Sequence, residues 1–146
     1  MLSTLLPVPN PGDEVIIFEP FYENYGPGCI ISGAEPVFVP LEPPDFTFDL
    51  DRLSRAVSPR TRAIIFNSPN NQTGKVFLRK ELALIADLCL QHDLLAITDE
   101  IYEHIVFDGE RHIPIATFPG MAERIITISG ISKSPRRRRG CPPPKK

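Results

Sequence analysis

The stretch from residue 94 to residue 102, Leu-Leu-Ala-Ile-Thr-Asp-Glu-Ile-Tyr, constrains the fold of this chain more than any other. An apolar run ends there in two carboxylates and a tyrosine. Because helical patterns flank the run, it predicts a strand covered on both faces, as in parallel sheets. Open parallel sheets bind ligands at the carboxyl ends of their strands. We therefore expect Asp99 and Tyr102 to face a bound group; the alternative is that Asp99 and Glu100 cap the next turn.

Short apolar runs elsewhere predict four more strands, and apolar residues at helical spacing predict three helices between them. The strands are expected at residues 14–18, 34–39, 62–66 and 124–129, and the helices within 21–32, over 50–57 and over 78–92. Asp49 is suited to cap the second helix. Residues 105–109 end in Asp-Gly and predict a hairpin or an excursion at the edge of the sheet. Strand-helix-strand order implies parallel pairing, so we expect an α/β fold with a mostly parallel sheet and flanking helices.

Charge separates an acidic body from a basic tail. Residues 1–132 hold all 18 acidic residues but only nine of the 16 basic ones, whereas residues 134–146 are rich in arginine, lysine and proline. The tail has no apolar periodicity and cannot bury enough surface to fold. We expect a domain at 1–133 followed by a disordered tail at 134–146.

The composition also excludes several classes of protein. No apolar run approaches the ~20 residues that a membrane-spanning helix needs, and the first residues do not resemble a signal peptide. The cysteines and histidines have no paired spacing, so they indicate neither a disulfide framework nor a metal site, and we expect the histidines at the surface. These residues are Cys29, Cys89, Cys141, His92, His104 and His112. A cytoplasmic protein without a metal is the expectation.

Four polar stretches follow the predicted strands. They are Glu-Pro-Phe-Tyr at 19–22, Asn-Ser-Pro-Asn-Asn-Gln-Thr-Gly-Lys at 67–75, Asp-Glu-Ile-Tyr at 99–102 and Ser-Gly-Ile-Ser-Lys at 129–133. In this order and spacing they resemble the large domain of the class I/II pyridoxal-phosphate-dependent aminotransferases, which have the fold called fold-type I. The resemblance extends over residues 10–133 and rests on the agreement of four separate motifs.

The resemblance implies a role for Lys133 and for Asp99. Lys133 matches the lysine that bonds covalently to the aldehyde of the cofactor, pyridoxal 5'-phosphate; desolvation or a second cation activates such a lysine. Without the motif before it, Lys133 would be read as a surface lysine. Asp99 matches the aspartate that pairs with the pyridine nitrogen and makes the ring a better electron sink.

The resemblance implies further contacts with the cofactor. Asn71 and Tyr102 match the pair that hydrogen-bonds the phenolic oxygen of the ring, and Tyr22 matches the aromatic residue that stacks on its face. Ser129 and Ser132, which flank the lysine motif, are candidates for the phosphate. Each has a plainer alternative, since Tyr22 could be a core aromatic and Asn71 could simply serve the turn.

The match with the family breaks at several places. Gln72 replaces the proline of the family's Asn-Pro-Thr-Gly turn, so we expect a turn that is strained or rebuilt. The family's glycine-rich phosphate loop, phosphate-binding arginine and small domain have no counterpart in this chain, and the arginines at 136–139 match no family motif. We therefore expect a truncated form that binds the cofactor weakly and transaminates little or not at all.

The resemblance implies transfer of an amino group between an amino acid and a 2-oxo acid. Family members are commonly homodimers, whereas a fragment of the sheet would leave an open edge that makes assembly doubtful. Carbon-sulfur lyases and cyclopropane-carboxylate synthases share the fold and the cofactor contacts and remain alternatives. A non-catalytic module with a basic tail for nucleic acid or an acidic partner is a third. It ranks last because the acidic body competes for the tail, and we expect no nucleic-acid or membrane partner.

Overall fold

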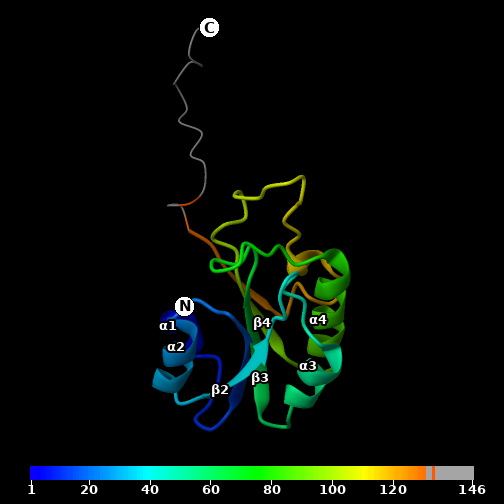
Figure 1. The fold of residues 1–146 in the computed structure, drawn as a ribbon. Coiled ribbons are helices and arrows are strands. Elements are labelled where there is room, and N and C mark those ends of the chain that lie inside the picture. Colours follow the sequence, from blue (N-terminus) through cyan, green and yellow to red (C-terminus); the bar gives the residue numbers. More distant parts are fainter. Residues whose placement is uncertain (131–132, 134–146) are drawn as a thin grey trace, which may run out of the picture.

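The computed structural model describes residues 1–130 and 133, which fold around one five-stranded sheet (Figure 1). The strands are β1 (Glu14–Glu19), β2 (Glu35–Pro40), β3 (Thr61–Asn67), β4 (Leu95–Asp99) and β5 (Ile125–Ile128). Their order is β2-β1-β3-β4-β5, and every neighbouring pair is parallel. The predicted α/β fold with a mostly parallel sheet is confirmed.

Helices cover both faces of the sheet. α1 (Leu2–Leu5) and α2 (Tyr25–Ile31) lie on one face, and α3 (Leu50–Ala56) and α4 (Arg79–His92) lie on the other (Figure 1). Alternate residues of each strand enter opposite cores. One core holds Leu5, Val15, Ile17, Cys29, Ala63 and Ile65, and the other holds Ile16, Leu53, Ile64, Leu82, Ile85 and Ala96. Burial on both faces explains why the strands are continuous apolar runs.

The starts of the three longer helices follow from local chemistry. Asp49 caps α3 as predicted, because its Oδ1 atom accepts from the main-chain nitrogens of Asp51 at 2.8 Å and Arg52 at 3.2 Å. At the start of α4, Glu81 accepts from the main-chain nitrogen of Leu78 at 2.7 Å. The predicted helix within 21–32 begins only at Tyr25, which puts Pro27 in the first turn. Proline is tolerated there because the first turn has no helical partners for its N–H groups.

The segment between β4 and β5 contains no strand. Residues 105–107 do not pair, and Phe107 is 73% exposed. Asp108 and Gly109 form the expected turn with φ values of 55° and 75°. Of the two predicted forms, the excursion is therefore present and the hairpin is not. The segment rises above the carboxyl ends of the strands (Figure 1) and returns through a short 3-10 helix, η1 (Ile115–Thr117).

β2 and β5 are the edges of the sheet, and their residues are less buried than those of the central strands. Within residues 1–130 and 133, no helix is long and apolar enough to cross a membrane. The predicted tail at 134–146 and the candidate residue Ser132 lie outside the described residues.

Candidate functional site

The strand order creates a crevice at the carboxyl end of the sheet. β2 lies on one side of β1, whereas β3, β4 and β5 follow on the other, so the direction of the crossovers reverses between β1 and β3. Open parallel sheets bind ligands beyond the carboxyl ends of strands at such reversals. A cavity of about 240 Å³ lies at this end, lined by residues that follow β1, β3, β4 and β5. These are Tyr22, Asn67, Asn71, Asp99, Ile101, Tyr102 and Lys133.

Five of the seven predicted site residues line this one cavity. They are Lys133, Asp99, Tyr102, Asn71 and Tyr22, which the sequence places on four separate motifs. Ser129 does not line it, because its hydroxyl donates to Oε1 of Glu103 at 3.2 Å. Ser132 lies outside the part of the chain that the structure describes.

Asp99 uses both oxygens of its carboxylate. Oδ1 accepts from the main-chain nitrogen of Ile101 at 3.2 Å, and Oδ2 accepts from the hydroxyl of Tyr25 at 2.7 Å. The capping contact considered from the sequence is therefore present, and the same side chain also lines the cavity. Each carboxylate oxygen has two lone pairs, so Asp99 can still accept from a ligand.

Asn71 and Tyr102 contact each other at the wall of the cavity. The Tyr102 hydroxyl donates to Oδ1 of Asn71 at 2.9 Å, and the Nδ2 atom of Asn71 has no acceptor among the described residues. The Nζ atom of Lys133 lies 5.9 Å from the centroid of the Tyr102 ring. An amide, a phenol and an amine therefore meet on one side of the cavity.

The turn that carries Asn71 is rebuilt around its polar side chains. Oδ1 of Asn70 accepts from the main-chain nitrogens of Gln72 at 2.9 Å and Thr73 at 3.0 Å. Gln72 uses its Nε2 atom to donate to the main-chain oxygen of Phe21 at 2.8 Å. The peptide bond between Asn71 and Gln72 is trans. Gln72 thus ties the turn after β3 to the segment after β1, which no proline could do through its side chain.

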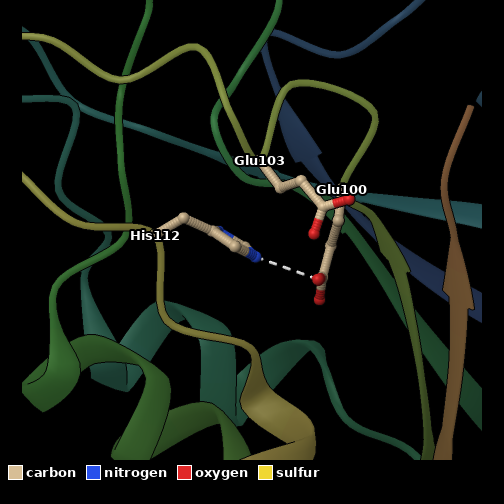
Figure 2. A group of neighbouring side chains, drawn as sticks. All are labelled: Glu100, Glu103 and His112. Atoms are coloured by element: carbon tan, nitrogen blue, oxygen red, sulfur yellow. Dashed lines mark hydrogen bonds and ion pairs between the residues drawn. The ribbon is translucent and has the colours of Figure 1, made fainter. Parts of the chain in front are cut away.

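Glu100, the neighbour of Asp99, points to the opposite face of the sheet and contacts His112 (Figure 2). The Nε2 atom of His112 lies 2.9 Å from Oε2 of Glu100, and the two side chains are only 8% and 5% exposed. The prediction of a surface histidine is therefore wrong at His112. Its partner lies 12 positions earlier, which no metal-ligand spacing would reveal.

Glu100, Glu103 and His112 bring their ligand atoms within 4.8 Å of one another. To bind a metal through Nε2, the imidazole of His112 would have to carry its proton on Nδ1. That atom is buried and has no hydrogen-bond partner, so coordination would leave a buried N–H unsatisfied. The arrangement favours a closed contact between Glu100 and His112 over a cation site.

Comparison with known proteins agrees with this geometry. The family model for aminotransferase class I and II matches residues 2–135. The chain belongs to this family. Among its relatives, the protein named "Probable N-succinyldiaminopimelate aminotransferase DapC" of Mycobacterium tuberculosis is 52% identical over 133 residues, which are 90% of this chain and 34% of the relative. Kynurenine–oxoglutarate transaminase 3 of Mus musculus is 49% identical over 135 residues, which cover 86% of this chain and 30% of that protein.

Solved structures of aminotransferases show the same fold. N-Succinyldiaminopimelate aminotransferase from Mycobacterium tuberculosis superposes with a TM-score of 0.88 at 51% identity, over 90% of this chain and 35% of that one. Aromatic aminotransferase from Pyrococcus horikoshii gives a TM-score of 0.86 at 44% identity, over 90% and 36%. This aminotransferase chain therefore spans about a third of the length of the relatives that it matches.

Two residues at this cavity carried no predicted role. Tyr25 donates to Asp99 from the first residue of α2, and Asn67 occupies the last position of β3. Asn67 donates through Nδ2 to the main-chain oxygen of Asp99 at 2.7 Å and accepts through Oδ1 from the main-chain nitrogen of Asn71 at 2.7 Å. A polar residue that ends a buried apolar strand was a signal for Asn67, whereas nothing in the sequence pairs Tyr25 with Asp99.

The groups that line the cavity fit pyridoxal 5'-phosphate, the cofactor expected for this family. Asp99 offers an anionic acceptor for a protonated ring nitrogen. The Nδ2 atom of Asn71 offers a donor for a phenolic oxygen, and the Tyr102 hydroxyl offers a second one once it turns away from Oδ1 of Asn71. Tyr22 contributes an aromatic face, and Lys133 contributes a primary amine. Lys133 is also the one cationic side chain among the described residues that line the cavity, so these residues provide no second cation for a phosphate.

Proposed function

We propose that this chain is the cofactor-binding part of a pyridoxal-phosphate-dependent aminotransferase. The observation that supports it is the convergence of five residues from four motifs on one cavity at the carboxyl end of a parallel sheet. Parallel sheets of many functions place ligands at this end, so the fold alone would not identify the chemistry. The residue types at the cavity, together with family membership, make the proposal specific.

When bound, the cofactor supplies an aldehyde and an electron-withdrawing ring. Asp99 would hold a proton on the ring nitrogen, because a carboxylate stabilises the cationic form of its neighbour. The Nδ2 atom of Asn71 would donate a hydrogen bond to the phenolic oxygen, and the Tyr102 hydroxyl would do so after leaving Oδ1 of Asn71. Tyr22 would cover one face of the ring. Lys133 would hold the aldehyde of the cofactor through Nζ, and the same amine would serve to move a proton at the substrate's α-carbon.

The substrates that we propose are an amino acid and a 2-oxo acid. The printed names of the relatives, an N-succinyldiaminopimelate aminotransferase and a kynurenine–oxoglutarate transaminase, support this class without choosing one substrate. We also propose that the aminotransferase acts as a homodimer, as is common in the family. Ser129 could reach a phosphate only after its hydroxyl leaves Glu103, so we assign it a weaker role than the cavity residues.

Reductive labelling tests the proposal. The chain is mixed with pyridoxal 5'-phosphate, reduced with borohydride and mapped by mass spectrometry. We expect Lys133 to be labelled in preference to the other lysines, at cofactor concentrations that reflect weak binding. Asp99→Ala should reduce the labelling of Lys133. Lys80 is exposed and lies outside the cavity, so it reports the background reaction. Equal labelling of Lys133 and Lys80 would reject the proposal.

A further inference from the structure

Tyr25 combines a core ring with a hydroxyl that reaches the cavity wall. The residue is 1% exposed and packs in the core between α2 and the sheet. Its hydroxyl donates to Oδ2 of Asp99 at 2.7 Å, across 74 positions of sequence. Its ring also meets that of Tyr22 edge to face, with centroids 5.9 Å apart. One side chain thus touches the carboxylate and the aromatic residue that we assign to the ring.

The hydroxyl completes the set of contacts that fixes Asp99. Asn67 holds the main-chain oxygen of Asp99 at 2.7 Å, and the nitrogen of Ile101 holds Oδ1 at 3.2 Å. The contact with Ile101 is local and lies at the long end of the usual range, so by itself it restrains rotation of the carboxylate about the Cβ–Cγ bond only weakly. The shorter bond from Tyr25 fixes the second oxygen and with it the plane of the carboxylate.

Tyr25 is a donor over the whole working range of pH. Burial, and after it the charge of Asp99, raises the pKa of the Tyr25 phenol far above its usual value. The phenol therefore keeps its proton at neutral pH, where it donates to Asp99.

We propose that Tyr25 is a positioning residue, which holds the Asp99 carboxylate in the plane needed to accept from the ring nitrogen of the cofactor. The inference rests on the proposed function, because it assigns Asp99 to that nitrogen. It differs from a purely structural role for Tyr25, in which the ring fills the core and the hydroxyl merely finds an acceptor.

The first test needs no cofactor. In the full chain, Tyr25→Phe keeps the ring and removes only the hydroxyl. We expect amide hydrogen exchange at Ile101 to accelerate about tenfold, because a rotating carboxylate accepts the hydrogen bond from the Ile101 N–H for less of the time. The amides of β3 and β4 should keep their exchange rates. Ser32→Ala removes another hydroxyl contact at the end of α2, from Ser32 to the main-chain oxygen of Cys29, and serves as the matched control. Unchanged exchange at Ile101, or faster exchange throughout the sheet, would contradict the inference.

The second test compares pyridoxal 5'-phosphate with its 1-deaza analogue, which has carbon in place of the ring nitrogen. Tyr25→Phe should weaken binding of pyridoxal 5'-phosphate about fivefold, as loss of one hydrogen bond implies, and leave the analogue unaffected. In an Asp99→Ala background, Tyr25→Phe should have no further effect. Equal weakening of both compounds would overturn the positioning role alone. Failure of the unaltered chain to bind either compound would overturn the proposed function, and the role of Tyr25 at the nitrogen with it.

Discussion

Asn67 donates from Nδ2 to the main-chain oxygen of Asp99 at 2.7 Å, which joins the ends of two neighbouring strands through a side chain. The same side chain accepts from the nitrogen of Asn71, so one buried amide holds two of the residues that line the cavity. The geometry of the site therefore depends on a residue that we assign no contact with the ring.

Asn67→Asp should destabilise the chain by about 1–3 kcal/mol, because a buried side chain would turn an acceptor in place of a donor toward the main-chain oxygen of Asp99. Urea unfolding followed by circular dichroism measures the change. Asn71→Asp is the control, since Asn71 is exposed and should cost less than about 0.5 kcal/mol. Equal losses in the two variants would show that the bridge does not support the sheet ends.

Tyr102→Phe should reduce reductive labelling of Lys133 by pyridoxal 5'-phosphate about fivefold, because one donor to the phenolic oxygen is lost. The contact between Tyr102 and Asn71 is exposed, so the free energy of unfolding should change by less than about 0.5 kcal/mol. Mass spectrometry and urea unfolding separate the two effects. A loss of stability without a loss of labelling would assign Tyr102 to the fold instead of the site.

Lys75 and Glu81 form a buried ion pair at 2.9 Å, with side chains 5% and 6% exposed. Lys75→Met should destabilise the chain by about 3 kcal/mol, because it leaves the carboxylate of Glu81 buried without its partner. Adding Glu81→Gln should recover most of that loss, since the glutamine oxygen can still accept from the nitrogen of Leu78. Thermal unfolding of the two single variants and the double variant measures the coupling, and simple additivity would contradict it.

His112→Ala should loosen the excursion above the sheet, because Oε2 of Glu100 would lose the buried imidazole that it contacts. We expect a loss of about 1–3 kcal/mol, as for a buried polar atom left without its partner, and faster limited proteolysis within residues 103–111. His104→Ala is the matched control, as His104 is 49% exposed and lies 3.7 Å from Glu103. Proteolysis at the same rate in both variants would mean that the contact between Glu100 and His112 does not hold the segment.

Stability should fall as the pH rises above about 9. Burial raises the pKa of Cys29 to about 11 and that of Cys89 to about 12, and the pKa of Tyr25 is raised further. Above the usual pKa values of 9.0 for cysteine and 10.0 for tyrosine, the unfolded chain loses protons that the folded chain keeps, so deprotonation favours unfolding. Each group contributes a slope of up to about 1.4 kcal/mol per pH unit. Under reducing conditions, the midpoint of urea unfolding should fall as the pH rises from 8 to 10.5, and it should fall less steeply in Cys89→Ala than in the unaltered chain.

Much of the fold could be predicted because its signals are local. Apolar runs marked all five strands, and Asp49 marked the start of α3. The sequence could not decide between a hairpin and an excursion at 105–109, because Asp-Gly specifies a turn but not a partner for the segments beside it. Whether such a segment pairs depends on neighbours that lie elsewhere in the sequence.

The site divides in the same way. The convergence of five residues on one cavity could be predicted because each belongs to a motif at the end of a strand; they are Lys133, Asp99, Tyr102, Asn71 and Tyr22. Their contacts with a cofactor stay predictions. The contacts of Tyr25 with Asp99 and of His112 with Glu100 could not be predicted, since they join segments 74 and 12 positions apart that share no motif. Such pairs form only when the sheet and its covering helices bring them together.

Asp99 and Glu100 are consecutive carboxylates on opposite sides of the sheet, one toward Tyr25 and the other toward His112. They lie on opposite sides because successive residues of a strand point to opposite faces of the sheet. Deleting or inserting a single residue in β4 would send a glutamate to the cavity and an aspartate to the imidazole, although the composition would barely change. Substitutions can therefore change this site one contact at a time, whereas adding or removing one residue in β4 would displace both carboxylates from their partners at once.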